Sequence, residues 1–167
     1  MKRDTFWKYP EYVKFYASFF LGNVGDWFDF FAIQIILAHQ FNATPNQIVL
    51  GLLAYMLPLV LFASIAGSVA DKLNRKGLLI ITDFLAGILT VLLIFCSNMV
   101  LFLAVVFLRS SFVAFNAPVQ KTMSKALLPT KLQLQASSYE SIIFQLCRII
   151  GPMCGAVVVA ISSPQYC

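Results

Sequence analysis

Polar side chains recur within the first long apolar run of the chain, residues 15–38. They are Asn23, Asp26, Asp29 and Gln34. Offsets of three, six and eleven residues keep them on one broad face of a helix with 3.6 residues per turn. A charged side chain inside a bilayer is costly unless it is paired or hydrated. Two kinds of chemistry fit: a static carboxylate paired with an arginine, or a carboxylate that binds a proton or a cationic solute in a wet cavity.

Two arginines in later apolar runs are candidate partners for these acids. At 1.5 Å per residue, Asp26 lies about 16 Å and Arg148 about 15 Å from the cytoplasmic ends of their runs. We therefore expect Asp26 and Arg148 to lie at equal depth and to pair. The same count places Arg109 at about 10 Å and Asp83 at about 9 Å, which makes them a second candidate ion pair. Arg109 could instead extend its side chain to the interface.

The last apolar run contains a candidate helix-packing motif. Gly151 and Gly155 have the GxxxG spacing, which lets a second helix approach closely. Pro152 between them removes one backbone donor and favours a bend. Such features around a charged interior indicate a solute pathway better than an inert anchor.

Five apolar runs must position these side chains, and each is near the roughly 20 helical residues that cross a bilayer. They lie near 15–38, 47–70, 77–96, 99–116 and 138–161. Hydrophobic residues make up 60% of the chain and charged residues only 11%, against about 25% charged in soluble domains. The sequence predicts an all-α, polytopic bundle of five transmembrane helices without a soluble domain. We expect no enzyme, cofactor or metal, since the four cysteines lack disulfide or metal spacing.

The net charge of +5 is distributed by membrane side. Ten of the twelve Lys and Arg lie before the first run, between the second and third, or between the fourth and fifth, and the segments 39–46, 97–98 and 162–167 have none. The positive-inside rule therefore predicts a cytoplasmic N-terminus and an outside C-terminus. This placement argues against a nucleic-acid partner.

Residues 67–76, GSVADKLNRK, resemble the loop signature G-x-x-x-D-R-x-G-R-K of the major facilitator superfamily. They contribute Gly67, Asp71, Lys72, Arg75 and Lys76, and lie between the second and third runs as in that family. Lysine at 72 keeps the charge of the usual arginine but loses its planar fork. The resemblance implies a conformational loop motif that latches the cytoplasmic side against a second transporter half.

The remaining matches imply a branch of that family. Arg109 lies where the family commonly has a functional arginine, although Ser110 follows instead of the usual glycine. Residues 148–155 resemble the helix-five motif of the antiporters, and 25–27, 57–58 and Asp83 resemble the bacterial macrolide-efflux-like subgroup. The resemblance implies proton-coupled efflux of small amphipathic solutes across the bacterial inner membrane, with lipid, solute, proton and a second half as partners. The proton or solute candidates are Asn23, Asp26, Asp29, Gln34, Arg109 and Arg148.

Length leaves alternatives open. Members of that family have twelve helices in two halves, whereas this chain has five apolar runs. We expect a fragment, one part of a split transporter, or a remnant. A non-transporting protein that assembles with or inhibits a full transporter is the alternative. A lysophospholipid or a metabolite is the alternative cargo, because fold does not determine cargo.

Overall fold

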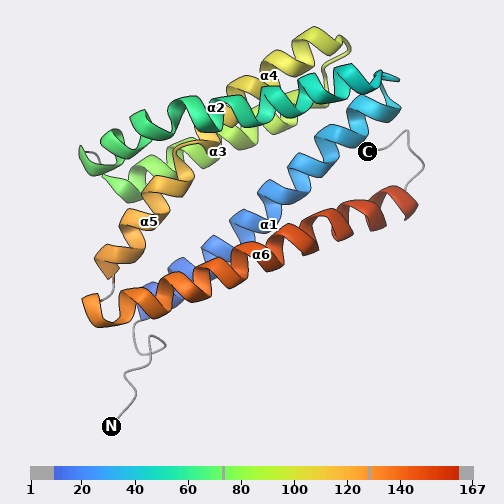
Figure 1. Ribbon diagram of the computed structural model, residues 1–167. Helices are drawn as coiled ribbons and strands as arrows, with labels where there is room; N and C mark the ends of the chain where they lie inside the picture. The colour runs from blue at the N-terminus through green and yellow to red at the C-terminus, as the bar shows by residue number, and fades with distance from the viewer. Residues whose placement is uncertain (1–9, 73, 128, 162–167) are drawn as a thin grey trace.

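The computed structural model describes residues 10–72, 74–127 and 129–161, and the regular secondary structure of these residues is all helical (Figure 1). Five segments are long and apolar enough to cross a membrane, with α4 and α5 forming one of them, Met99–Leu127. The helices are α1 (Pro10–His39), α2 (Pro45–Lys72), α3 (Arg75–Leu93), α4 (Met99–Val113), α5 (Asn116–Leu127) and α6 (Thr130–Ile161). The all-helical class and the five long apolar helices predicted from the sequence are confirmed.

Local capping explains where α2 and α4 begin. Thr44 precedes α2, and the Gln47 Oε1 atom accepts a 2.8 Å hydrogen bond from the Thr44 backbone N–H. This is the returning half of a capping box, and Pro45 occupies the first helical position, where its missing N–H is not needed. The Asn98 side chain caps α4 by accepting from the Val100 N–H at 2.8 Å. Such caps end the short links and start the next span.

The segment 117–137, which the hydropathy pattern assigns to a polar connection, is instead mostly helix. It forms most of α5 and the start of α6. Its prolines are compatible with this, since Pro118 lies in the first turn of α5 and Pro129 directly precedes α6. A search for apolar runs recognises helices by their lipid-facing residues, so it misses polar helical turns.

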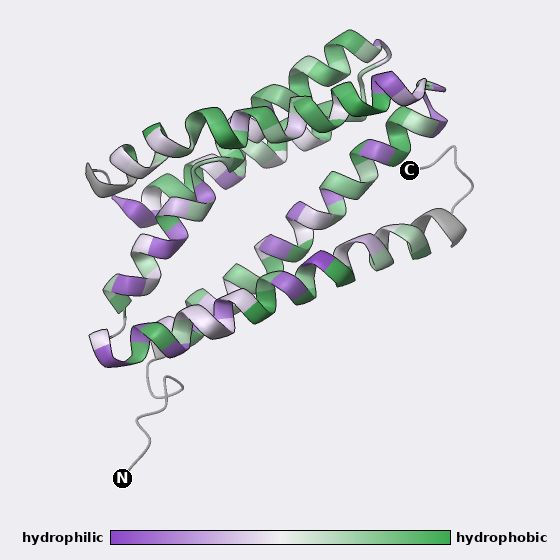
Figure 2. Ribbon diagram, in the orientation of Figure 1, coloured by the Kyte–Doolittle hydropathy of each residue, from purple (hydrophilic) through white to green (hydrophobic). Residues whose placement is uncertain are grey.

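The spans pack as two groups (Figure 1). α1 lies along α6, while α2 and α3 both pack on α4. The groups meet where α1 contacts α2 and through α5, which contacts helices of both groups. One apolar core lies among α1, α2, α3 and α4, and it includes Leu37, Tyr55 and Phe102. Figure 2 shows apolar residues along most of each span and hydrophilic ones along α5 and the start of α6. Large exposed apolar side chains cover the outside, as a lipid-facing bundle requires.

The contact between α1 and α6 depends on two glycines. A Cβ atom on Gly151 would lie 2.5 Å from the Trp27 Cβ atom, and one on Gly155 would lie 2.7 Å from the Phe31 Cδ1 atom. Gly151 therefore packs against the backbone of α1, and Gly155 packs against the Phe31 side chain, as the GxxxG spacing allows. Pro152, between them, lies inside α6.

Candidate functional site

A buried arginine joins three helices near the middle of the bundle. Arg109 of α4 is 3% exposed. Its Nη2 atom pairs with an Asp29 carboxylate oxygen and lies 3.7 Å from the Asp26 Oδ1 atom. Its Nε atom donates to the Thr90 hydroxyl of α3 at 2.8 Å. Asp26 and Asp29 are three residues apart on α1, which is the spacing that lets one guanidinium meet both carboxylates.

A cavity of about 920 Å³ lies beside this arginine, between α1, α3, α4 and α5. It runs from Lys14 and Lys76, near the starts of α1 and α3, to the acidic pair. The Arg109 Nη1 atom is buried and has no hydrogen-bond partner within the described residues. The lining combines apolar walls with charged groups, namely Phe15, Phe19, Leu79, Ile80, Asp26, Asp29, Asp83 and Arg109.

Asp83 belongs to a second polar cluster. The Asn116 Nδ2 atom donates to the Asp83 Oδ1 atom at 2.7 Å, and the Thr82 hydroxyl lies 3.2 Å from the Asn116 Oδ1 atom. The expected ion pair between Asp83 and Arg109 is therefore wrong. The fourth span continues through α5 to Leu127 instead of ending near Asn116, so Arg109 lies deeper than the sequence count implied, at the level of Asp26 and Asp29.

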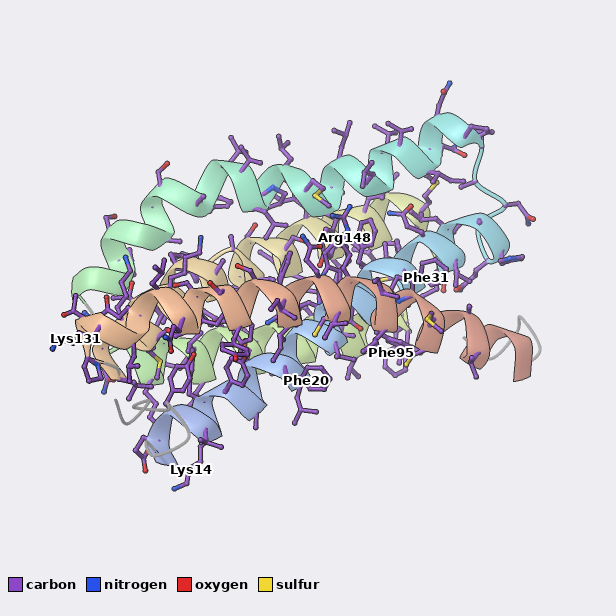
Figure 3. All side chains as sticks on the ribbon, turned by 60° about the horizontal axis from the view of Figure 1, so that its bottom comes forward. Lys14, Phe20, Phe31, Phe95, Lys131 and Arg148 are labelled. Atoms are coloured by element: carbon purple, nitrogen blue, oxygen red, sulfur yellow. The ribbon has the colours of Figure 1, made fainter. Side chains whose placement is uncertain are left out.

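Arg148 is not the partner of Asp26, although the two side chains do lie at a similar level. The Arg148 guanidinium carbon is 5.5 Å from the centroid of the Trp27 ring, and the side chain is exposed. Figure 3 shows Arg148 on the side of α6 that lies toward α2. Successive helical residues point about 100° apart. The Asp26 side chain therefore points toward Arg109, while the Trp27 side chain contacts Arg148.

The other two polar residues of α1 do not line the cavity. Asn23 is buried, and its Nδ2 atom donates to the Phe19 carbonyl of the same helix at 2.7 Å. The Gln34 amide atoms are buried without a partner among the described residues. A Cβ atom on Gly51 would lie 3.9 Å from the Gln34 Oε1 atom, so this amide lies at the contact with α2.

Three further residues of the site were not recognised in the sequence. Thr90 accepts from Arg109, Asn116 donates to Asp83, and the Tyr55 hydroxyl donates to the Asp26 carbonyl at 3.4 Å. Thr90 follows Asp83 by seven residues, which is two helical turns on one face, so helical spacing could have indicated it. Asn116 likewise follows Arg109 by seven residues, whereas the second apolar run has no charged residue from which helical spacing could have indicated Tyr55.

The loop motif occupies two helix ends. Gly67 lies within α2, Asp71 and Lys72 form its last turn, and Arg75 and Lys76 begin α3. The side chains of Asp71 and Lys72 lie outside the described residues. A Cβ atom on Gly67 would meet no atom within 4 Å. Only residues 73 and 74 separate the two helices, and Lys76 also lines the cavity.

Comparison with known proteins places the whole apolar region in one family. The Major Facilitator Superfamily profile matches residues 15–167. The uncharacterized MFS-type transporters YfiS and YkuC of Bacillus subtilis are 25% and 26% identical to the chain, covering 86% and 89% of it and 34% and 35% of their own lengths. The Staphyloferrin A transporter of Staphylococcus aureus is 26% identical over 88% of the chain and 38% of its own length. The chain thus spans about a third of the length of these relatives. No solved structure gave a significant match.

Proposed function

The chain belongs to the major facilitator superfamily, a family of membrane transporters and not of enzymes, and on this premise we propose that it forms the N-terminal part of a proton-coupled efflux transporter. The observation that supports the proposal is Arg109, which is almost fully buried and pairs with two carboxylates beside a cavity. Two carboxylates that share one guanidinium leave one negative charge uncompensated. Protonation removes that charge, so the site suits reversible proton binding in a poorly solvated interior.

The geometry also supports a switching step. Asp29 makes the close contact with Arg109, while Asp26 lies 3.7 Å from the same Nη2 atom. Protonation of Asp29 would weaken its charge-assisted bond. The guanidinium would then move toward Asp26 and change the tie between α4 and α1. Two discrete arrangements of one arginine provide the bistable element that a transport cycle needs.

The loop motif has a separate role in this proposal. Asp71 and Arg75 would hold the ends of α2 and α3 against a second transporter half on the cytoplasmic side. The contacts would form in one state of the transporter and break in the other. Membrane lipid, a solute, protons and the second half are thus the proposed partners.

The solute in this proposal is small and amphipathic, and it leaves the cell. Phe15, Phe19, Leu79 and Ile80 supply apolar walls to the cavity, while Arg109 supplies a buried donor. The relative named for staphyloferrin A favours a siderophore as a second candidate cargo.

Inverted membrane vesicles that contain the chain and a complete second half would test the proposal. A pH gradient should drive accumulation of at least one dye from a panel of cationic, neutral and anionic amphipathic dyes. Asp29→Asn should abolish uphill accumulation but retain exchange down a dye gradient, because it fixes the protonated arrangement. Lys131→Gln, which neutralises an exposed residue that does not line the cavity, serves as the control and should accumulate dye normally. Accumulation that persists after the pH gradient is collapsed would contradict proton coupling.

A further inference from the structure

A cation lies near the middle of the α1/α6 pair with no anion beside it. Arg148 contacts the ring of Trp27, a residue near the middle of α1 (Pro10–His39). Its side chain is exposed, and within the described part of the chain it has no ion pair or hydrogen bond. A guanidinium that faced lipid at this depth would cost several kcal/mol. The surface around Arg148 therefore requires water, an anion or both.

The nearby acids do not meet this requirement. Asp26 and Asp29 both lie at Arg109, and Asp83 accepts a hydrogen bond from Asn116. Any anion that binds Arg148 must therefore come from outside the described residues.

The surface around Arg148 is aromatic. Trp27 makes edge-on contacts with Phe144 and Phe30, each with ring centroids 5.9 Å apart, and Phe30 contacts Tyr55 at 5.0 Å. Gly151 packs on the Cβ atom and backbone of Trp27, which holds this tryptophan in place. A guanidinium over an aromatic ring keeps its N–H donors in its own plane. These donors can bind a carboxylate in the bidentate manner.

We propose that Arg148 and the aromatic residues Trp27, Phe30 and Phe144 form a binding site for a solute that combines a carboxylate with a flat apolar body. This assignment rests on the proposed transport function, and it adds a second contact site for the solute, on α1 and α6, to the cavity beside Arg109. It also separates two roles, because the anion binds at Arg148 while the proton binds at Asp26 and Asp29. Asp26 and Trp27 are adjacent residues of α1, so the two sites lie next to each other on this helix.

Trp27 provides a direct binding assay. The chain has two tryptophans, so Trp7→Phe leaves Trp27 as the sole tryptophan, whose emission is excited selectively at a wavelength that tyrosine does not absorb. In lipid nanodiscs, the heavy-atom probes 4-iodobenzoate and 4-iodobenzamide should both quench it, and their half-saturating concentrations are compared. We expect the carboxylate to act at about tenfold lower concentration than the amide, as charge-assisted bonding implies. The neutral amide partitions better into lipid, so nonspecific quenching would give the opposite preference.

Substitutions at position 148 test the assignment. Arg148→Gln should remove the preference for the carboxylate, and Arg148→Lys should reduce it because lysine lacks the fork. Lys131→Gln neutralises an exposed cation near the start of the same helix and should keep the preference. If Arg148→Gln loses its helical circular dichroism signal, the carboxylate preference of Arg148→Lys alone tests the assignment.

Three outcomes would overturn the proposal. They are equal quenching by both probes, an unchanged preference in Arg148→Lys and Arg148→Gln, and a preference that disappears once a second transporter half is present. The last outcome would assign the anion to an acidic side chain of that half. Binding is measured at equilibrium without a pH gradient, so its failure is distinct from a failure of proton coupling.

Discussion

At the scale of single residues, the bundle is organised by one arginine and two aspartates. The Arg109 Nε atom donates to the Thr90 hydroxyl, and the Nη2 atom pairs with Asp29 and lies 3.7 Å from the Asp26 Oδ1 atom. This arrangement ties α1, α3 and α4 together through polar contacts in an apolar setting. Removing the cation would leave two carboxylates facing each other without compensation.

Arg109→Gln should therefore strongly destabilise the bundle. Breaking a buried ion pair by removal of one partner costs about 3–5 kcal/mol. Thermal unfolding of the purified chain in detergent, followed by size-exclusion fluorescence, would measure the loss. Lys14→Gln removes a side chain that is 75% exposed, and it should change the melting temperature little.

A double variant separates direct coupling from general damage. Arg109→Gln with Asp29→Asn should recover part of the stability that Arg109→Gln loses, because one of the two uncompensated carboxylates is gone and Asp26 no longer faces a second negative charge. Strict additivity of the two single losses would show that Arg109 and Asp29 do not interact.

At the scale of helices, close backbone approach and polar ties hold α1 to its neighbours. The Tyr12 hydroxyl donates to the Glu140 Oε1 atom at 3.2 Å, and the Ser124 hydroxyl also donates to this carboxylate. Glu140 thus links α1, α5 and α6 near the starts of α1 and α6. Farther along the same pair, Gly151 and Gly155 let α6 contact α1 directly.

Gly151→Ala should separate α1 from α6. The new methyl group would lie 2.5 Å from the Trp27 Cβ atom and 3.0 Å from the Phe28 backbone N atom. Neither atom can move without shifting a helix, so we expect a loss of about 1–3 kcal/mol. Thermal unfolding in detergent would measure the loss.

Gly87→Ala is the matched control for that substitution. A Cβ atom there meets nothing within 4 Å. Alanine also has the higher helix propensity, by about 1 kcal/mol, so stability should stay the same or rise. Equal destabilisation by Gly87→Ala and Gly151→Ala would show that the helix contact is not responsible.

At the scale of the whole molecule, membrane orientation remains a prediction from the loop cations. A chain whose only cysteine is Cys167, with alanine at 96, 147 and 154, should react with a membrane-impermeant thiol reagent in intact cells, because the positive-inside rule places this end outside. A matched chain carrying only Lys131→Cys should react after lysis alone. The reverse pattern would invert the topology.

The latch at the ends of α2 and α3 is also tested in the whole transporter. Asp71→Ala should leave insertion intact but abolish transport when the chain is expressed with a complete second half, because it removes the carboxylate of the proposed latch. Lys72→Arg restores the residue usual in the family and should retain transport. Dye accumulation in inverted vesicles, at matched protein levels, is the measurement. Normal accumulation by Asp71→Ala would exclude the latch.

Hydropathy and helical spacing predicted several features correctly. Long apolar runs indicated five spans, because a helix in lipid must cover its backbone with apolar side chains. Counting along the helices also brought Arg148 to the level of Asp26, since the rise per residue is constant. The polar turns of α5 and of early α6 have no apolar run that would indicate a helix. Because the fourth span was therefore expected to end near Asn116, the predicted depth of Arg109 was too small.

The pairing of charges was decided by tertiary structure alone. Depth along a helix follows from residue number, but the direction of a side chain toward a neighbouring helix depends on how each helix is rotated in the bundle. Here the close approach of Gly151 to Trp27 determines how α6 meets α1. As a result Arg148 lies over the Trp27 ring, and Asp26 pairs with Arg109. No property of the linear sequence contains that rotation, because it results from the packing of all the helices together.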